Sequence, residues 1–159
     1  KKITYLIISL IFLSFINACA GYKPIHTTNL QFEIANYSIK TNKKLGRQIY
    51  SKLYNLSKSN KKNAETKSIT IIIDTTKNKN AAAKDNAGKV LEYRIILINN
   101  IIIKDHLTDD EILNQTFSYS STYKVQDQHS DTIKFENKSI EDLINKTYQN
   151  LLIKMSKVF

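Results

Sequence analysis

The side chains able to do catalytic or metal chemistry are scattered through this sequence. His26, His106 and His129 show no metal-site spacing, and the chain has a single cysteine. The acidic run at residues 109–111 lies between two predicted strands, which is typical of a solvated turn. With three glycines, the sequence has no phosphate-binding loop and no nucleophile elbow. We therefore expect no catalytic residues, no metal site and no enzyme activity.

Cys19 is the residue whose position predicts a covalent reaction. Two lysines and an apolar stretch from Ile3 to Ile16 precede it, which is the pattern of an export signal. The stretch is too short for a membrane-spanning helix. A thiol directly after a signal peptide can accept diacylglycerol, and residues 16–19 resemble the bacterial lipobox. We expect residues 1–18 to be removed and Cys19 to carry diacylglycerol and an N-linked acyl chain, with no cofactor. An ordinary signal peptide followed by a chance cysteine is the alternative.

The charge balance predicts an acidic partner. The chain has 24 basic and 14 acidic residues, a formal net charge of +10. In the cell envelope such a partner is anionic lipid, lipopolysaccharide or an acidic protein surface, and nucleic acid is not expected. Lys84, Lys89 and Arg94 are the candidate phosphate-binding residues, and Lys77 and Lys79 belong to the same basic region. A basic loop that is merely solvated is the alternative.

The first half of the chain predicts a tether, two strands and a helix. Pro24 prevents a helix within residues 19–29, which form the tether. Alternating polarity predicts a strand over residues 30–35, and an apolar stripe predicts a helix that begins after a Thr41 or Asn42 cap. The β-branched run at residues 68–74 predicts the second strand. Residues 77–88 predict a flexible hairpin connection or a sheet edge.

The second half predicts a hairpin and a long helix. Residues 90–103 and 117–125 form the third and fourth strands, with turn chemistry at residues 104–110. Tyr93, Tyr119 and Tyr123 are expected to pack on the sheet, and a protein partner is the alternative. A terminal helix, capped at Ser139 or beginning as early as Ser130, carries an apolar stripe to residue 158.

The order β-α-β-β-β-α therefore predicts an α+β fold. Two helices covering one face of a four-stranded sheet, a two-layer sandwich, is the economical packing of these elements. The sequence shows no internal repeat and no second domain, so residues 30–159 are expected to form one domain.

Three motifs resemble the LptE family of lipopolysaccharide-assembly lipoproteins, in its alphaproteobacterial form. The segment CAGYKPI at residues 19–25 is similar to the family's Cys-Gly-Phe-x-Pro-Leu start. The segment GKVLEYR at residues 88–94 is similar to a Gly-x-Ala-x-Arg-Tyr-Arg stretch that leads into a strand. The segment SSTYKVQDQ at residues 120–128 is similar to a Ser-Tyr-x-Val-x-Asp pattern before the last helix.

The resemblance implies a function as well as a fold. It implies an outer-membrane lipoprotein, anchored by lipid on the periplasmic side, whose domain lies within the lumen of the LptD β-barrel. There it would plug the barrel, assist barrel assembly and help insert lipopolysaccharide into the outer leaflet. Its partners would be LptD, lipopolysaccharide and the outer membrane. The alternative is an envelope lipoprotein that binds another protein complex or a small anionic ligand.

Overall fold

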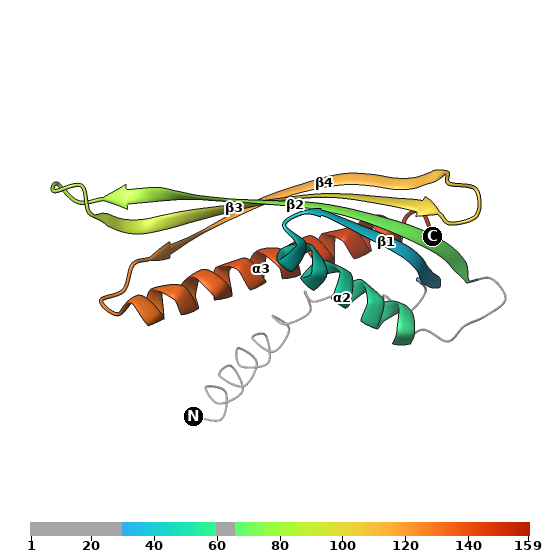
Figure 1. Cartoon of the computed structure of the whole chain (residues 1–159), viewed down its shortest axis with the longest axis horizontal. Coiled ribbons are helices and arrows are strands. Elements are labelled where there is room, and N and C mark those ends of the chain that lie inside the picture. The colour runs from blue at the N-terminus through green and yellow to red at the C-terminus, as the bar shows by residue number, and fades with distance from the viewer. Residues whose placement is uncertain (1–29, 60–65) are drawn as a thin grey trace, which may run out of the picture.

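The computed structural model describes residues 30–59 and 66–159 (Figure 1). Its elements are β1 (Phe32–Thr41), α2 (Lys43–Ser59), β2 (Lys67–Lys84), β3 (Val90–Asp105), β4 (Glu111–Lys124) and α3 (His129–Met155). This order confirms the predicted β-α-β-β-β-α arrangement and the α+β fold. The predicted signal peptide, Cys19 and the tether lie outside the described residues.

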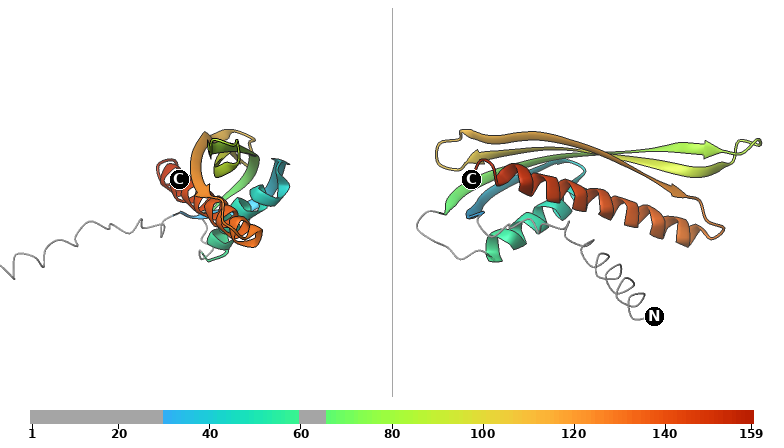
Figure 2. Two further views of the ribbon diagram at one scale, coloured as in Figure 1. Left: turned by 90° about the vertical axis from the view of Figure 1, so that its left-hand side faces the viewer. Right: turned by 180° about the vertical axis from the view of Figure 1, so that it is seen from behind.

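The four strands form one mixed sheet in the order β1-β2-β3-β4. β1 pairs with β2 in parallel, whereas β2–β3 and β3–β4 are antiparallel. The two helices lie on the same side of this sheet, as Figures 1 and 2 show from three directions. A parallel pair needs a crossover connection, and α2 belongs to the connection between β1 and β2.

The core fills the space between the sheet and the helices. Strand side chains alternate between the two faces, so the odd-numbered residues of β2 and β3 point toward the helices. Ile69, Ile71 and Ile73 of β2 are fully buried there, beside Ile101 and Ile103 of β3. The helices contribute Leu45, Ile49 and Leu53 from α2 and Ile140, Leu143, Ile144, Leu151, Leu152 and Met155 from α3. The isoleucine-rich strands thus supply most of one wall of the core.

A row of buried, hydrogen-bonded polar side chains crosses the centre of this core, called the buried polar chain below. Thr75 Oγ1 donates to Asn99 Oδ1 at 3.0 Å, and Asn99 Nδ2 donates to Thr147 Oγ1 at 3.0 Å. Thr147 Oγ1 in turn donates to the carbonyl of Leu143 at 3.0 Å. All three polar side chains are fully buried. Because a buried polar group without a partner is costly, this chain fixes α3 against β2 and β3 at one register.

The helix α2 begins where the sequence predicts. Asn42 Oδ1 accepts a hydrogen bond from the amide of Leu45 at 3.1 Å, so Asn42 is the cap. Thr41 has a φ of 51° and its hydroxyl donates to Asp74 at 2.5 Å, which turns the chain from β1 into the helix. Gly46 lets the helix approach the sheet closely, because a Cβ at this position would collide with Ile39 of β1.

The strand β2 runs well past the predicted stretch. Residues 77–88 were expected to be a flexible hairpin connection or a sheet edge, and residues 77–84 continue as strand opposite β3, with Lys77 opposite Leu97 and Lys79 opposite Ile95. β1 pairs with β2 only as far as Thr75, so residues 77–84 lie at an edge of the sheet. The predicted sheet edge is confirmed, whereas the alternative of a flexible connection is wrong. The turn itself is short: Asp85 Oδ1 accepts from the amides of Ala87 and Lys89, and Gly88 has a φ of 83°.

Other boundaries also differ from the predicted ones. β1 extends to Thr41, and β4 begins at Glu111 instead of residue 117. The helix α3 begins at His129, which confirms the earlier of the two predicted starts, Ser130, to within one residue. Ser139 lies buried inside the helix, so Ser139 is not a cap. In the part of the chain that the structure describes, none of the helices has the length and apolar character to span a membrane.

Candidate functional site

The structure separates the predicted basic region into two sets of residues. Lys77 and Lys79 lie on the helix-covered face of the sheet, because they continue the odd-numbered series of β2. Arg94 pairs with Asn80 and projects from the uncovered face. Lys79 and Arg94 are thus close along the ladder but present their charges on opposite faces of the sheet. The five basic residues therefore do not form one surface.

Lys77 and Lys79 converge on a single carboxylate of α3. Lys77 Nζ lies 3.2 Å from Glu136 Oε1, and Lys79 Nζ lies 2.6 Å from Oε2. The hydroxyl of Tyr123 donates to the same Oε2 at 2.8 Å. The ammonium group of Lys79 also lies 4.2 Å from the centre of the Tyr93 ring, a cation–π distance. These four groups and Glu136 are called the Glu136 cluster below.

The environment of the Glu136 cluster favours its charged form. Partial burial opposes ionisation, but hydrogen bonds from Lys79, Tyr123 and Lys77 outweigh it and lower the pKa of Glu136 from 4.5 to about 2. Burial acts to lower the pKa of Lys79, and the bonds to Glu136 and Tyr123 reverse that effect and raise it. Both groups are thus charged at neutral pH, and the charges of Lys77 and Lys79 are partly neutralised within the molecule.

Sequence reasoning missed Glu136, although a signal was present. Glu136 stands four residues after Thr132 and four before Ile140, both of which are buried on the face of α3 that contacts the sheet. A carboxylate on the apolar stripe of an amphipathic helix needs a partner across the interface. Lys77 and Lys79, two residues apart on one strand face, are the natural candidates.

Lys84, Lys89 and Arg94 occupy the outer part of the β2–β3 hairpin, and all three are exposed. Lys84 pairs with Val90, next to Lys89 in the turn, whereas Arg94 lies four residues farther along β3. At a rise of 3.3 Å per residue that separation is about 13 Å. The hairpin therefore brings Lys84 near Lys89 but does not bring Arg94 into a compact site with them.

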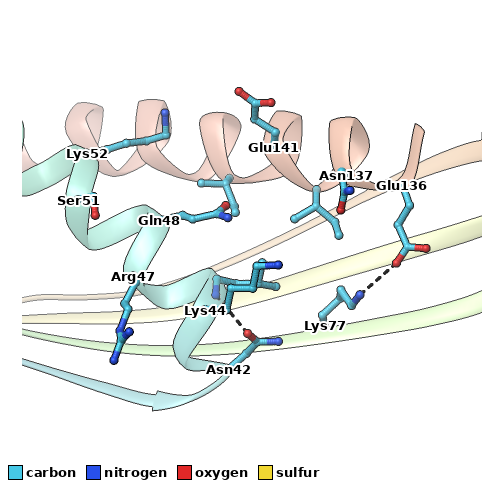
Figure 3. Close-up of a pocket in the computed structure, with 13 residues that line it drawn as sticks. Asn42, Lys44, Arg47, Gln48, Ser51, Lys52, Lys77, Glu136, Asn137 and Glu141 are labelled. Atoms are coloured by element: carbon cyan, nitrogen blue, oxygen red, sulfur yellow. Dashed lines mark hydrogen bonds and ion pairs between the residues drawn. The ribbon is translucent and has the colours of Figure 1, made fainter. Parts of the chain in front are cut away.

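A groove of about 730 Å³ lies between α2 and α3, beside the Glu136 cluster (Figure 3). Leu45, Ile140 and Ile144 give it apolar lining. In Figure 3 Lys52 reaches across toward α3, whereas Arg47 points away from that helix. Charged, amide and hydroxyl groups complete the lining: Asn42, Lys44, Arg47, Gln48, Ser51, Lys52, Lys77, Glu136, Asn137 and Glu141. Such a lining can bind an anionic or amphipathic ligand.

The acidic run and His106, which the sequence predicted to be turn residues, do lie at the turn between β3 and β4. Residues 106–110 form the turn between β3 and β4, where Lys104 Nζ lies 2.9 Å from Asp109 Oδ2. Hydrogen bonds from the amides of Thr108 and Leu107 lower the pKa of Asp105. His106 Nδ1 is 3.0 Å from Thr70 Oγ1. Within residues 30–59 and 66–159, no group of three or more His, Cys, Asp and Glu side chains is placed to hold a metal ion.

The three tyrosines pack as core side chains, which confirms the first of the two readings. Tyr123 is 6% exposed, and Tyr93 and Tyr119 are partly buried against the core. The rings of Tyr93 and Tyr123 lie 5.9 Å apart, and Lys146 Nζ is 4.7 Å from the centre of the Tyr119 ring. Their hydroxyl and ring edges are therefore only partly available to a partner.

The fold is shared with solved bacterial lipoproteins. Lipoprotein B from Nitrosomonas europaea has a TM-score of 0.58 at 16% identity, over 83% of this chain and 88% of that one. A minor lipoprotein from Acinetobacter baumannii has a TM-score of 0.57 at 11% identity, over 80% and 92%. Rare lipoprotein B from Shewanella oneidensis has a TM-score of 0.53 at 16% identity, over 77% and 94%.

These likenesses concern the architecture alone. No protein-family model and no curated protein sequence matches the chain. The described residues therefore define an α+β fold, with one face of the sheet covered by helices, of the kind found in these lipoproteins.

Proposed function

We propose that this protein is an outer-membrane lipoprotein of the LptE type. In this proposal the lipid on Cys19 holds the chain at the periplasmic side of the outer membrane. The α+β domain inserts into the lumen of the LptD barrel, assists its assembly and helps to pass lipopolysaccharide to the outer leaflet.

The observation that carries the proposal is the pairing of a lipobox with this fold. Solved structures with the same architecture bear the name lipoprotein and match about four-fifths of the chain. The segment before Cys19 has the composition of an export signal. Two or three acyl chains on one cysteine suffice for stable membrane anchoring, so the domain would remain at the membrane.

The uncovered face of the sheet suits a polar enclosure. Along β4 this face presents Asn114, Thr116, Ser118, Ser120 and Thr122, all exposed. The lumen of a large membrane barrel is lined by polar side chains. The β4 part of this face, from Asn114 to Thr122, is uncharged and rich in hydroxyl groups, so it can contact such a lining through hydrogen bonds without burying unpaired charge.

The proposal is tested by capturing the protein from its own membrane. The tagged full-length chain would be purified from detergent-solubilised outer membranes, and the co-purified proteins identified by mass spectrometry. We expect a large LptD-type barrel at near-equal amounts. A Cys19→Ser variant with the same tag serves as the control, because it lacks the anchor and should recover much less barrel. Wild-type lipidated protein recovered without a barrel would reject the plug function.

A second candidate function is binding of a small anionic ligand, and the groove between α2 and α3 favours it. Lys44 and Lys52 line this groove beside apolar Leu45 and Ile144. Native mass spectrometry of the purified protein would show a bound small molecule if this function holds. Retention of such a molecule by wild type but not by a Lys44→Glu, Lys52→Glu variant would favour the ligand-binding function over the plug.

A further inference from the structure

The outer edge of β4 is chemically unusual for a sheet edge. β4 is the last strand of the sheet, and no described strand pairs with its outer side. From Ile112 to Tyr123 the strand contains no charged residue, no glycine and no proline. Proteins normally protect an exposed edge with lysine, proline or a bulge, because unpaired amides and carbonyls recruit another strand.

The direction of the edge backbone groups follows from the ladder. The amide of Val125 donates to the carbonyl of Leu91 at 2.9 Å, which continues the β3–β4 register. Odd-numbered residues of β4 therefore bond to β3, and even-numbered residues direct their N–H and C=O groups outward. The outward series is Asn114, Thr116, Ser118, Ser120 and Thr122.

We propose that this edge pairs with the same edge of a second copy of the chain. An antiparallel pair with its two-fold axis at Ser118 places Ser118 opposite Ser118, with Thr116 opposite Ser120 on either side. In all three pairs of that stretch, the backbone N–H and C=O groups of both residues point toward the other copy. The two residues of each pair can therefore exchange two backbone hydrogen bonds, as in an antiparallel ladder. The two sheets become one continuous sheet with the helices of both copies on the same face.

The charges at the two ends of β4 favour the antiparallel orientation over the parallel one. Glu111 begins the strand and Lys124 ends it, and both are exposed. Antiparallel self-pairing brings Lys124 of each copy diagonally beside Glu111 of the other. A parallel pair would instead place Glu111 beside Glu111 and Lys124 beside Lys124, where like charges repel. The charge pattern of the edge is thus complementary to itself in one orientation only.

Side chains on both faces of the new pair are compatible with it. On the uncovered face, serine and threonine hydroxyls oppose one another and can exchange hydrogen bonds. On the helix face, Phe117 of one copy comes opposite Tyr119 of the other, an aromatic pair at the sheet junction. Phe117 already belongs to the core, and Tyr119 is only partly buried, so pairing covers more of the tyrosine ring.

The first test measures the oligomeric state of the full lipidated chain in mild detergent by sedimentation over a concentration series. We expect a concentration-dependent dimer. Ser118→Lys places two lysines opposite each other at the axis and should weaken dimerisation at least about tenfold. Thr76→Lys, an exposed change on the same face of the sheet but on β2, away from the β4 edge, is the matched control and should leave the dimer intact. A wild-type monomer at all concentrations, or an unchanged Ser118→Lys dimer, would overturn the proposal.

The second test examines the orientation by charge exchange. Glu111→Lys alone and Lys124→Glu alone should each weaken the dimer a few-fold, since each puts like charges together. The double variant Glu111→Lys, Lys124→Glu should recover wild-type dimerisation because the complementary pairs are restored. Failure of the double variant to recover would contradict antiparallel self-pairing. The inference goes beyond the proposed function and concerns copies of the chain that are not enclosed in a barrel. Barrel capture and self-association are separate measurements with separate controls.

Discussion

The two halves of the β2–β3 hairpin are held by different forces. In the half that contains Ile71, Ile73 and Ile101, the helix-facing side chains of residues 69–75 and 99–103 are fully buried. In the half that runs from Lys77 to the turn at Gly88, most of β2 is exposed. Both halves are regular strand over the same ladder. In the outer half β3 still contributes the fully buried Ile95 and Leu97, opposite Lys79 and Lys77, so β2 continues there as a polar strand beside an apolar one.

The difference also determines where each half is vulnerable. The inner half depends on packing and on the polar chain through Asn99, so a small change there alters the whole domain. The outer half depends on the Glu136 cluster, which ties β2 to the first half of α3 at one point. Substitutions can separate these two contributions, from the largest expected effect to the smallest.

Asn99→Ala should cause the largest loss of stability. It removes both hydrogen bonds of the buried amide and leaves the hydroxyls of Thr75 and Thr147 without that partner. We expect the free energy of unfolding to fall by about 3 kcal/mol. The free energies of unfolding of Asn99→Ala and Asn100→Ala would be compared by denaturant unfolding. Asn100 is the neighbour on the uncovered face, so Asn100→Ala is the control. An Asn99 variant no less stable than the Asn100 variant would show that the buried chain is not a stabilising element.

Glu136→Gln should cause a smaller loss, confined to the outer half. The substitution keeps the shape of the side chain but leaves Lys77 and Lys79 close together without a counter-charge. Both lysines are about one-third exposed, so solvent screening limits the effect to about 2 kcal/mol. Amide exchange should accelerate in residues 77–84 more than in residues 69–75. Glu141→Gln, at an exposed groove position, is the control and should change neither quantity.

The contrast between the two halves of the hairpin explains which strands could be predicted from the sequence alone. Alternation and β-branching located the inner strands, because burial on one face leaves a period-two pattern in residues 69–73 and 95–103. The Asn42 cap was equally visible, since capping is a local interaction. Residues 77–84 carry lysine, asparagine and alanine, so their strand depends on the partner β3 and has no local signature.

The candidate site was harder to predict for the same reason. Lys77, Lys79, Lys84, Lys89 and Arg94 are close in sequence, which suggested one basic surface. Strand alternation and the length of the hairpin divide them among two faces and a turn. The carboxylate that binds two of them is far away in sequence, on α3. Its position on an apolar helix stripe was the available clue, and only the packing of α3 shows which strand it meets.

The Glu136 cluster should also give the domain a specific dependence on pH. The pKa of this carboxyl is about 2 in the folded protein, below the ordinary value of 4.5. A lowered folded pKa means that the stabilisation is complete above about pH 4.5 and is lost as the pH falls toward 2. Wild type should therefore lose its advantage of about 2 kcal/mol over Glu136→Gln across this window. Urea unfolding of both proteins from pH 7 to pH 2 measures the difference in their free energies of unfolding. A difference that does not change with pH would contradict the lowered pKa of Glu136.

Charge reversal at the tip of the hairpin should have the smallest effect on stability. Lys84→Glu, Lys89→Glu and Arg94→Glu alter exposed side chains, so the combined change in the free energy of unfolding should stay within about 0.5 kcal/mol per site. If these residues bind lipopolysaccharide phosphates, affinity should fall by tenfold or more, with Lys84 and Lys89 dominating because Arg94 lies about 13 Å away. A triple reversal at Lys138, Lys154 and Lys157 matches the change in net charge. Equal losses in the two triple variants would assign the binding to overall charge, and a loss specific to the hairpin would assign it to the outer half of β2–β3.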